Sequence, residues 1–526
     1  MDDIMMRIVE VLLSIPYLLT VILISVVTDS KSIGTMMLAL VLTGLAACGS
    51  GGETGGEDEG LTLRIACGAD PVNMDPRKTW VGSGYSINYH IAEPLVFRQY
   101  DEAGNVSFYG VLAESWEQPD ELTWQFNLRQ GVTFHNGEPF TSSDVKFTIE
   151  SMLEEDFISS VKTWMSDVAS IETPDESTVV ITTKTPSRGF LASICQVPIV
   201  SEKAVTEMGD EEFNLRPVGT GPYVCASYTA NSEVVLERYD GYWGKAGQAD
   251  RMVFRIMPES STRVAALKAG EVDIAENIPT DKVAELNDTE GLSVQTVATT
   301  RVDFMGYTIG QNKWIDQKEF RQAISLAIDR QLIVDTILGG TTVTAKSVSP
   351  VGSIGYDETL SERPYDPEQA KQLLADIGYD GSVITMGGCN GRYAMDSQVV
   401  QAVADMLMAV GINVELTVLD WSSYQPKRLE FDFWYIGQTD FTNDPGQHWS
   451  TTFLAGNDTG YSNPEVDELV AQANATMEEE GARALYQQAA RILIDDEASC
   501  PLFLEPSIIG VSDKVQGLDC GADDYL

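Results

Sequence analysis

Basic residues and histidine are scarce in this chain. Among its 526 residues, 34 are Lys or Arg and 79 are Asp or Glu, which gives a formal net charge of −45. A surface this acidic repels a phosphate backbone and argues against nucleic-acid binding. The three histidines, His90, His135 and His448, lie far apart, and no two have the i, i+4 spacing of a helical metal site. We therefore interpret them as structural and expect no metal.

Cysteine and the common catalytic motifs are also lacking. Seven cysteines are too few for a disulfide framework at this length, and no C-x-x-C pair indicates a zinc-ribbon or thioredoxin-like site. The sequence has no G-x-S-x-G, H-E-x-x-H, G-x-x-x-x-G-K-[ST] or G-x-G-x-x-G motif. We expect no cofactor and no catalysis, although acidic pairs are too common to exclude a glycosidase-type dyad. Disulfide pairing stays open among Cys67, Cys195, Cys225, Cys389, Cys500 and Cys520.

The amino-terminal region has the composition of an export signal. After Lys31, an uncharged and largely apolar run extends from Ile33 to Ala47, and small residues stand directly before Cys48. Such an arrangement is typical of a secretory signal. The segment before Cys48 resembles the lipobox of bacterial lipoproteins, which implies cleavage there and diacylglycerol on the cysteine sulfur. Residues 48–60 would then be a flexible Gly- and Glu-rich tether.

A second apolar run precedes this signal. Val11 to Val27 is uncharged and nearly long enough to span a bilayer. Residues 1–28 resemble a membrane segment of the permease subunit of peptide importers. An export signal needs only one apolar run, so we interpret this stretch as a gene-boundary artefact and not as a functional membrane domain.

Strand and helix signals alternate through the rest of the chain. The chain is long enough for about three folding units, and with 43% hydrophobic residues it is apolar enough to fold. Alternating and β-branched runs predict strands at 61–67, 122–128 and 178–183. Capping signals and apolar stripes predict helices at 142–153, 320–328, 367–377, 398–410 and 464–477. The alternation favours an α/β fold.

Seven sequence blocks together resemble one known family in their residues and in their order. They are Asn73–Pro76, Glu93–Val96, Leu112–Trp116, Phe126–Gly137, Pro217–Tyr223, Phe320–Ile324 and Tyr365–Lys371. In this order they resemble the peptide-binding family (family 5) of solute-binding proteins that serve bacterial ABC importers, over about 61–520. The resemblance implies a two-lobed periplasmic-binding-protein-like fold of type II, with an extra subdomain inserted in lobe I.

The resemblance also implies a division of the chain and a function. Lobe I would comprise 61–85, 205–303 and 488–526, the inserted subdomain 86–204, and lobe II 304–487. The protein would be a monomer outside the cytoplasm, anchored to the bacterial cell membrane by lipid. It would capture di- or oligopeptides between its lobes and deliver them to ABC permease subunits and their ATPase. The segment 135–137 is expected to be a structural turn.

Five residues are expected to contact the ligand on the strength of this resemblance. Arg392 matches the arginine that pairs with the ligand carboxylate, and Trp421 matches a tryptophan of the pocket wall. Asp440 is the candidate partner of the ligand ammonium. Tyr85 and Ser83, expected in the loop after the first strand, are further candidates.

The ammonium-binding segment departs from the family pattern Gly-Trp-x-x-Asp-x-x-Asp-Pro. In residues 437–445, Phe441 takes the place of the anchoring aspartate, Asp440 falls one residue early, and Gln438 replaces the tryptophan. A ligand without a free ammonium, such as a nickel chelate or an oligosaccharide, is therefore a rival hypothesis. Two more rival hypotheses are a secreted hydrolase with an Asp/Glu pair and a peptide sensor without transport.

Overall fold

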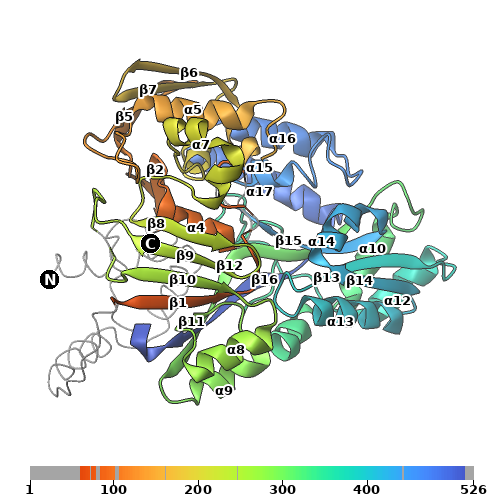
Figure 1. Ribbon diagram of the computed structural model, residues 1–526. Helices are drawn as coiled ribbons and strands as arrows, with labels where there is room; N and C mark the ends of the chain where they lie inside the picture. The colour runs from red at the N-terminus through yellow and green to blue at the C-terminus, as the bar shows by residue number, and fades with distance from the viewer. Residues whose placement is uncertain are drawn as a thin grey trace, which may run out of the picture.

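The structure is a computed structural model that describes residues 60–71, 73–78, 83–100, 106–159, 161–245, 247–440 and 444–515 (Figure 1). The predicted signal, the lipid-bearing Cys48, both apolar runs, the tether up to residue 59, and Cys520 lie outside the described residues. Within the described part of the chain, every helix is too short or too polar to cross a membrane.

A ten-stranded mixed sheet forms the centre of the molecule. Its two long strands, β12 (Leu292–Tyr307) and β16 (Ser499–Ser512), are antiparallel neighbours that continue through both halves of the sheet. The first half-sheet comprises β11 (Ile274–Ala275), β1 (Thr62–Cys67), β10 (Arg251–Ile256), β9 (Glu233–Arg238) and β8 (Tyr223–Thr229). The second half-sheet comprises β15 (Phe433–Thr439), β13 (Ile384–Asn390) and β14 (Val414–Asp420).

The register of β12 and β16 changes where the two half-sheets meet. Leu292 to Ala298 pair with Ser512 to Pro506, and pairing resumes with Val302 opposite Leu504. A bulge of this kind bends a strand and increases its twist. The two strands therefore join the half-sheets through a bent, irregular segment at 298–302 and 504–506.

A third group of elements lies above the first half-sheet in Figure 1. It contains the strand pair β2 (Val96–Tyr100) and β3 (Val106–Gly110), and a four-stranded sheet of β4 (Ala113–Asp120), β5 (Thr123–Leu128), β7 (Thr178–Thr183) and β6 (Val168–Asp175). Its helical elements are α5 (Ser142–Leu153), η1 (Lys162–Met165), α6 (Phe190–Ile194) and α7 (Glu202–Leu215). Phe126, Phe134, Ile149 and Ile181 belong to its own hydrophobic core.

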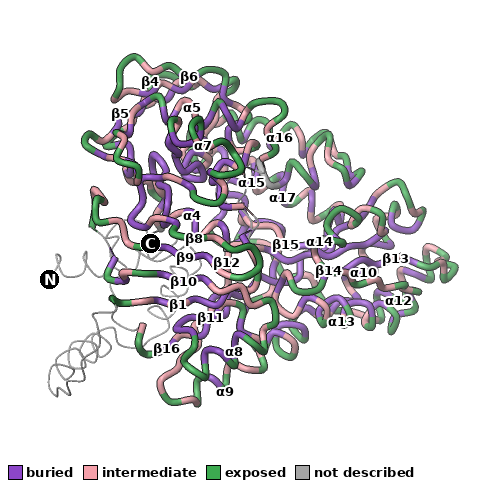
Figure 2. The backbone as a smooth tube through the Cα atoms, in the orientation of Figure 1, coloured by how far each residue is buried: buried purple, intermediate pink, exposed green. Residues whose placement is uncertain are grey.

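Helices cover both half-sheets, so the central strands are buried along most of their length (Figure 2). The first half-sheet is accompanied by α4 (Ser83–Ile91), α8 (Ser260–Ala269), η2 (Thr280–Lys282), α9 (Val283–Asn287) and η5 (Asp513–Val515). The second is accompanied by α10 (Lys318–Ala327), α11 (Arg330–Leu332), η3 (Ile333–Ile337), α12 (Pro367–Asp376), α13 (Asp396–Ala409), α14 (Trp421–Tyr424), η4 (Gln425–Glu430), α15 (Pro445–Trp449), α16 (Pro464–Ala475) and α17 (Glu479–Asp495).

The predicted α/β architecture and its capping signals are confirmed. The backbone N–H of Thr141 donates to the Asp144 carboxylate at 2.9 Å at the start of α5. The Asp366 carboxylate accepts from the N–H of Gln369 at 2.9 Å at the start of α12. Both bonds satisfy amide groups that the first turn of a helix leaves free.

Two local predictions differ from the structure. Ser83 and Tyr85 belong to helix α4 and not to a loop, because Ile87 and Ile91 bury one apolar stripe of this segment in the core. Helix α13 begins at Asp396, two residues earlier than expected, because the Asp396 carboxylate holds the preceding turn.

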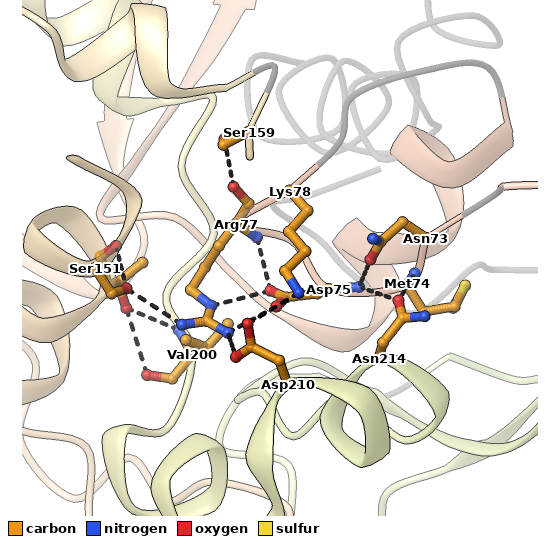
Figure 3. Close-up of polar contacts among 11 residues, drawn as sticks. Asn73, Met74, Asp75, Arg77, Lys78, Ser151, Ser159, Val200, Asp210 and Asn214 are labelled. Atoms are coloured by element: carbon orange, nitrogen blue, oxygen red, sulfur yellow. Dashed lines mark hydrogen bonds and ion pairs between the residues drawn. The ribbon is translucent and has the colours of Figure 1, made fainter. Parts of the chain in front are cut away.

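The Asn73–Pro76 block anchors the upper group of elements to the rest of the molecule (Figure 3). Arg77, which is 2% exposed, forms an ion pair of 2.7 Å with Asp75 and another of 3.0 Å with Asp210 of α7. Its Nη1 donates to the Ser151 hydroxyl of α5 at 3.3 Å. A buried guanidinium needs such partners to offset its desolvation. This part of the family likeness is therefore structural and does not by itself form a binding site.

Candidate ligand-binding site

Charged side chains gather on one face of the sheet where the half-sheets meet. Strand β12 pairs with β15 so that Arg301 lies opposite Thr439 and Asp303 lies opposite Gly437. Alternate residues of a strand point to the same face, so both charged side chains lie together. Arg301 Nε donates to Thr439 Oγ1 at 3.0 Å. Tyr435, two residues before Gly437, donates its hydroxyl to Asp303 Oδ2 at 2.5 Å.

Gly437 makes room for these side chains. A Cβ atom at this position would lie 2.1 Å from Asp303 Oδ1 and 2.7 Å from Arg301 Cδ. It would also lie 2.9 Å from the Tyr393 ring. The absence of a side chain at 437 is therefore what allows Arg301, Asp303 and Tyr393 to pack above β15.

The turn that carries Arg392 is held over this face by two carboxylates. Asp396 accepts hydrogen bonds from the backbone N–H groups of Gly391, Arg392 and Tyr393, at 3.2, 2.8 and 3.1 Å. Glu505 Oε1, on β16, accepts from the N–H of the next residue, Ala394, at 2.9 Å. Because these bonds engage successive backbone amides, they position the Arg392 side chain without occupying its guanidinium group.

Arg392 lies against aromatic rings and lacks a carboxylate partner. Its Cζ is 5.3 Å from the centre of the Tyr393 ring and 5.6 Å from that of Trp421. No described carboxylate lies within ion-pair distance, and its buried Nε donates no hydrogen bond to a described residue. Burial, followed by the positive charge of Arg301, lowers the pKa of the Arg392 guanidinium.

Asp303, on β12, and Glu505, on β16, are buried carboxyl groups whose charges interact. Asp303 is fully buried and Glu505 is 8% exposed. Neither Asp303 Oδ1 nor Glu505 Oε2 accepts a hydrogen bond from a described N–H or hydroxyl group. Burial, and then the charge of Glu505, raise the pKa of the Asp303 carboxyl.

The structure brings Trp421 to Arg392 and places Asp440 directly after Thr439, the hydrogen-bond partner of Arg301. Asp440 is 1% exposed, and its charge is among the causes that raise the pKa of Asp444. Asp444 forms an ion pair of 2.5 Å with Arg188, which comes from the segment before α6. Asp440 therefore lies in the chain between the site residue Thr439 and Asp444, and its part in ligand binding stays a prediction.

The remaining expected contact residues lie on α4. The Tyr85 ring is 4.8 Å from that of Tyr89, whose hydroxyl donates to the carbonyl of Cys195 at 2.7 Å. The structure does not bring Tyr85 into contact with Arg392 or Trp421. Ser83 is the first residue of the helix, and its side chain is outside the described part of the molecule.

The histidines and cysteines of the described chain have structural surroundings. Burial lowers the pKa of both His90 and His135 to about 4, and His135 Nε2 lies 2.9 Å from the Gly221 carbonyl oxygen in the expected turn. The described residues hold no group of three or more His, Cys, Asp or Glu that could bind a metal ion. The described cysteines are free and buried: Cys67, Cys195, Cys225, Cys389 and Cys500.

Sequence reasoning missed four residues of this site, namely Arg301, Asp303, Asp396 and Glu505. Glu505 carried a signal, because it is the only charged residue between Cys500 and Gly510 in an otherwise apolar segment. Charged residues are seldom fully buried without a specific partner, so a single one in a buried strand marks a functional or paired position.

Two half-sheets joined by two crossing strands, with charged side chains at the crossing, define a two-lobed binding protein. Residues 107–460 match the family model described as bacterial extracellular solute-binding proteins, family 5, middle. The chain belongs to this family, and the resemblance noted in the sequence is confirmed. Members are binding proteins, not enzymes; they work outside the cytoplasm and deliver peptides or other small solutes to ABC permeases.

Individual relatives cover nearly the whole chain. Di/tripeptide-binding protein 1 of Pseudomonas aeruginosa is 28% identical over 82% of this chain and 87% of its own length. Heme-binding protein A of Haemophilus influenzae is 26% identical over 92% and 96%. The periplasmic binding protein DppA of Helicobacter pylori, solved with the peptide STSA, has a TM-score of 0.78 and 26% identity, and the alignment covers 89% of this chain and 97% of DppA.

Proposed function

We propose that this protein captures short peptides by their free carboxylate and delivers them to an ABC permease. The Arg392 guanidinium carries this proposal, because it is oriented by Asp396, packed on Tyr393 and Trp421, and has no ion pair among the described residues. A partly buried guanidinium without a counter-charge is costly, and a bound carboxylate would supply that charge. The peptide-binding relatives support the same ligand class.

The proposed capture uses the expected division into lobes. Lobe I comprises 61–85, 205–303 and 488–526, the inserted subdomain 86–204, and lobe II 304–487. The bend at 298–302 and 504–506 would act as the hinge. The Arg188–Asp444 ion pair connects the inserted subdomain with lobe II, and it would hold the closed state.

Other parts of the proposal rest on the sequence. The lipobox-like segment supports a lipid anchor on Cys48 at the bacterial cell membrane, and a monomer is the expected state. The ligand contacts of Asp440, Tyr85 and Ser83 stay predictions from the family likeness. Trp421 is the proposed pocket wall, because its ring already packs beside Arg392.

A titration of Arg392→Gln with paired ligands tests the proposal. Free-acid di- and tripeptides should bind the variant about 10- to 100-fold more weakly, which corresponds to the loss of a charge-assisted hydrogen bond of about 1.5–3 kcal/mol. The same peptides with a carboxyl-terminal amide should bind both proteins equally. Arg483→Gln is the matched control, because this arginine pairs with Glu479 on the surface of α17. Equal losses for acids and amides would reject the assigned role.

A carboxylated solute without an ammonium is the second candidate. The departure of residues 437–445 from the family pattern, and the hydrogen bond of the Gln438 amide to Thr452 at 2.9 Å, favour it. Amino-terminal acetylation distinguishes the two candidates. If acetylated peptides bind as well as free ones, the ammonium has no specific partner, and a non-peptide acid fits the site equally well.

A further inference from the structure

A second arginine beside Arg392 also lacks a counter-charge. Arg301 Cζ is 5.8 Å from the centre of the same Tyr393 ring. Its Nε is taken by Thr439, but neither Nη atom donates to a described residue, and no described carboxylate is within ion-pair distance. Arg301 is partly exposed, as Arg392 is, so both guanidinium groups can meet a solute.

The nearby carboxylates form hydrogen bonds to other groups and not to the two arginines. Both oxygens of Asp396 accept backbone N–H groups, and Glu505 Oε1 accepts one as well. Asp303 Oδ2 accepts the Tyr435 hydroxyl. Among the described residues, none of these carboxylates forms an ion pair with Arg301 or Arg392.

Two positive charges are held beside the same Tyr393 ring, and the charge of Arg301 is one of the causes that lower the pKa of Arg392. Like charges held close together repel, so an anion that contacts both guanidinium groups would stabilise the pair.

We propose that Arg301 and Arg392 form a two-arginine site that binds a single carboxylate of the solute, with Arg301 as a specificity-determining residue. The inference rests on the proposed function, in that the solute binds at this crossing of the strands. Its ligand class is a carboxylic acid, whether a peptide with a free carboxyl terminus or another organic acid. Two guanidinium forks offer a carboxylate more donors than the single one predicted from the sequence.

Arg301 lies at the bend of β12 that we propose as the hinge between the lobes. It lies on β12 within the bend where the register with β16 changes, whereas Arg392 lies on the turn after β13. A carboxylate that contacts both side chains therefore links the hinge strand with the second half-sheet. Loss of Arg301 should weaken the discrimination between acid and amide, and not the general affinity for peptides.

The test compares Arg301→Gln, Arg392→Gln and the double variant by calorimetric titration, with Arg483→Gln as control. The probes are a panel of free-acid dipeptides, the same peptides as amides, and N-acetylated amino acids. We expect Arg301→Gln to weaken every acid about 10-fold or more and to leave the amides unchanged. In the double variant, acid and amide should bind equally. Arg301→Lys, which keeps the charge but not the fork, should lie between the wild type and Arg301→Gln.

The outcomes separate this inference from the proposed function. If the wild type prefers acids and Arg301→Gln keeps that preference in full, the two-arginine site is wrong and the role of Arg392 stands. If Arg301→Gln weakens acids and amides alike, Arg301 is only structural and the inference fails. If acetylated amino acids bind, if their binding depends on Arg301, and if no peptide binds, the two-arginine site stands and the proposed peptide function fails. If none of the probes binds, both are overturned.

Discussion

Replacing Gly437 by alanine perturbs the candidate site at a single atom. The new Cβ would lie 2.1 Å from Asp303 Oδ1, whereas ordinary contact begins at 3.4 Å, so the carboxyl group must move by about 1.3 Å. Arg301 and Tyr393 must move as well, because their nearest atoms would lie at 2.7 and 2.9 Å. Asp303 cannot move this far and keep its hydrogen bond to Tyr435.

The expected cost follows from these displacements. Overpacking a close-packed core costs about 1–3 kcal/mol, and a lost hydrogen bond adds about 0.5–1.5 kcal/mol. We therefore expect Gly437→Ala to lower the free energy of unfolding by about 2–4 kcal/mol. The change should also weaken the binding of free-acid peptides, because the two guanidinium groups are displaced. Urea unfolding followed by tryptophan fluorescence measures the first effect, since Trp434 lies on the same strand.

A glycine with space around it provides the control. A Cβ at Gly189 would approach no atom closer than 3.6 Å, and its φ of −78° suits any residue. Gly189→Ala should change the free energy of unfolding by less than about 1 kcal/mol. Combining Gly437→Ala with Asp303→Ala should recover part of the loss, because one clashing side chain is removed. If Gly437→Ala is as stable as the wild type and binds acids as tightly, the close packing of Asp303 and Arg301 over Gly437 is incorrect.

Three further changes have defined outcomes. Asp303→Asn should gain stability relative to the wild type as pH rises from about 4 to 8, by at most about 1.4 kcal/mol per pH unit. The reason is that the raised pKa of Asp303 makes the folded wild type favour the protonated acid, an advantage that disappears at higher pH. A stability difference in urea unfolding that stays constant across this pH range would contradict the prediction. Arg188→Gln should shift the ligand-bound protein toward a more open shape in small-angle X-ray scattering, because Asp444, directly before α15, loses its partner directly before α6; unchanged profiles would argue against this contact as a closing element. Arg77→Met should lower the free energy of unfolding by about 3–5 kcal/mol in urea, because it leaves the buried Asp75 unpaired; a loss below about 1 kcal/mol would contradict the role of this ion pair.

Signals in the local sequence predicted the helix starts that depend on hydrogen bonds between residues close in the chain. The caps at Thr141 and Asp366 define helix starts because the bonds they make lie within one turn. The ordered blocks indicated the family and, through it, the two-lobed fold. Arg392 was predicted through the same family likeness, and its role in binding stays a prediction.

The rest of the site depends on contacts between distant segments. Arg301 and Glu505 lie on β12 and β16, which pair across a bulge, and a bulge at this position has no clear signature in the sequence. The neighbourhood of Asp440 depends on Arg188, which comes from another part of the chain. The helical state of Tyr85 follows from burial of Ile87 and Ile91, which is a property of the packed core and not of the local segment alone.

The acidity of the whole chain gives the two unpaired arginines their importance. A formal charge of −45 repels an anionic solute, but at physiological salt this repulsion is screened beyond about 8 Å. Selection of a carboxylate must therefore come from charges within a few ångströms of it. In a chain with so few basic residues, Arg301 and Arg392 lie beside one aromatic ring, and the carboxylates around them accept hydrogen bonds from backbone amides or a tyrosine. The guanidinium groups thus keep donors that a carboxylate of the solute can engage.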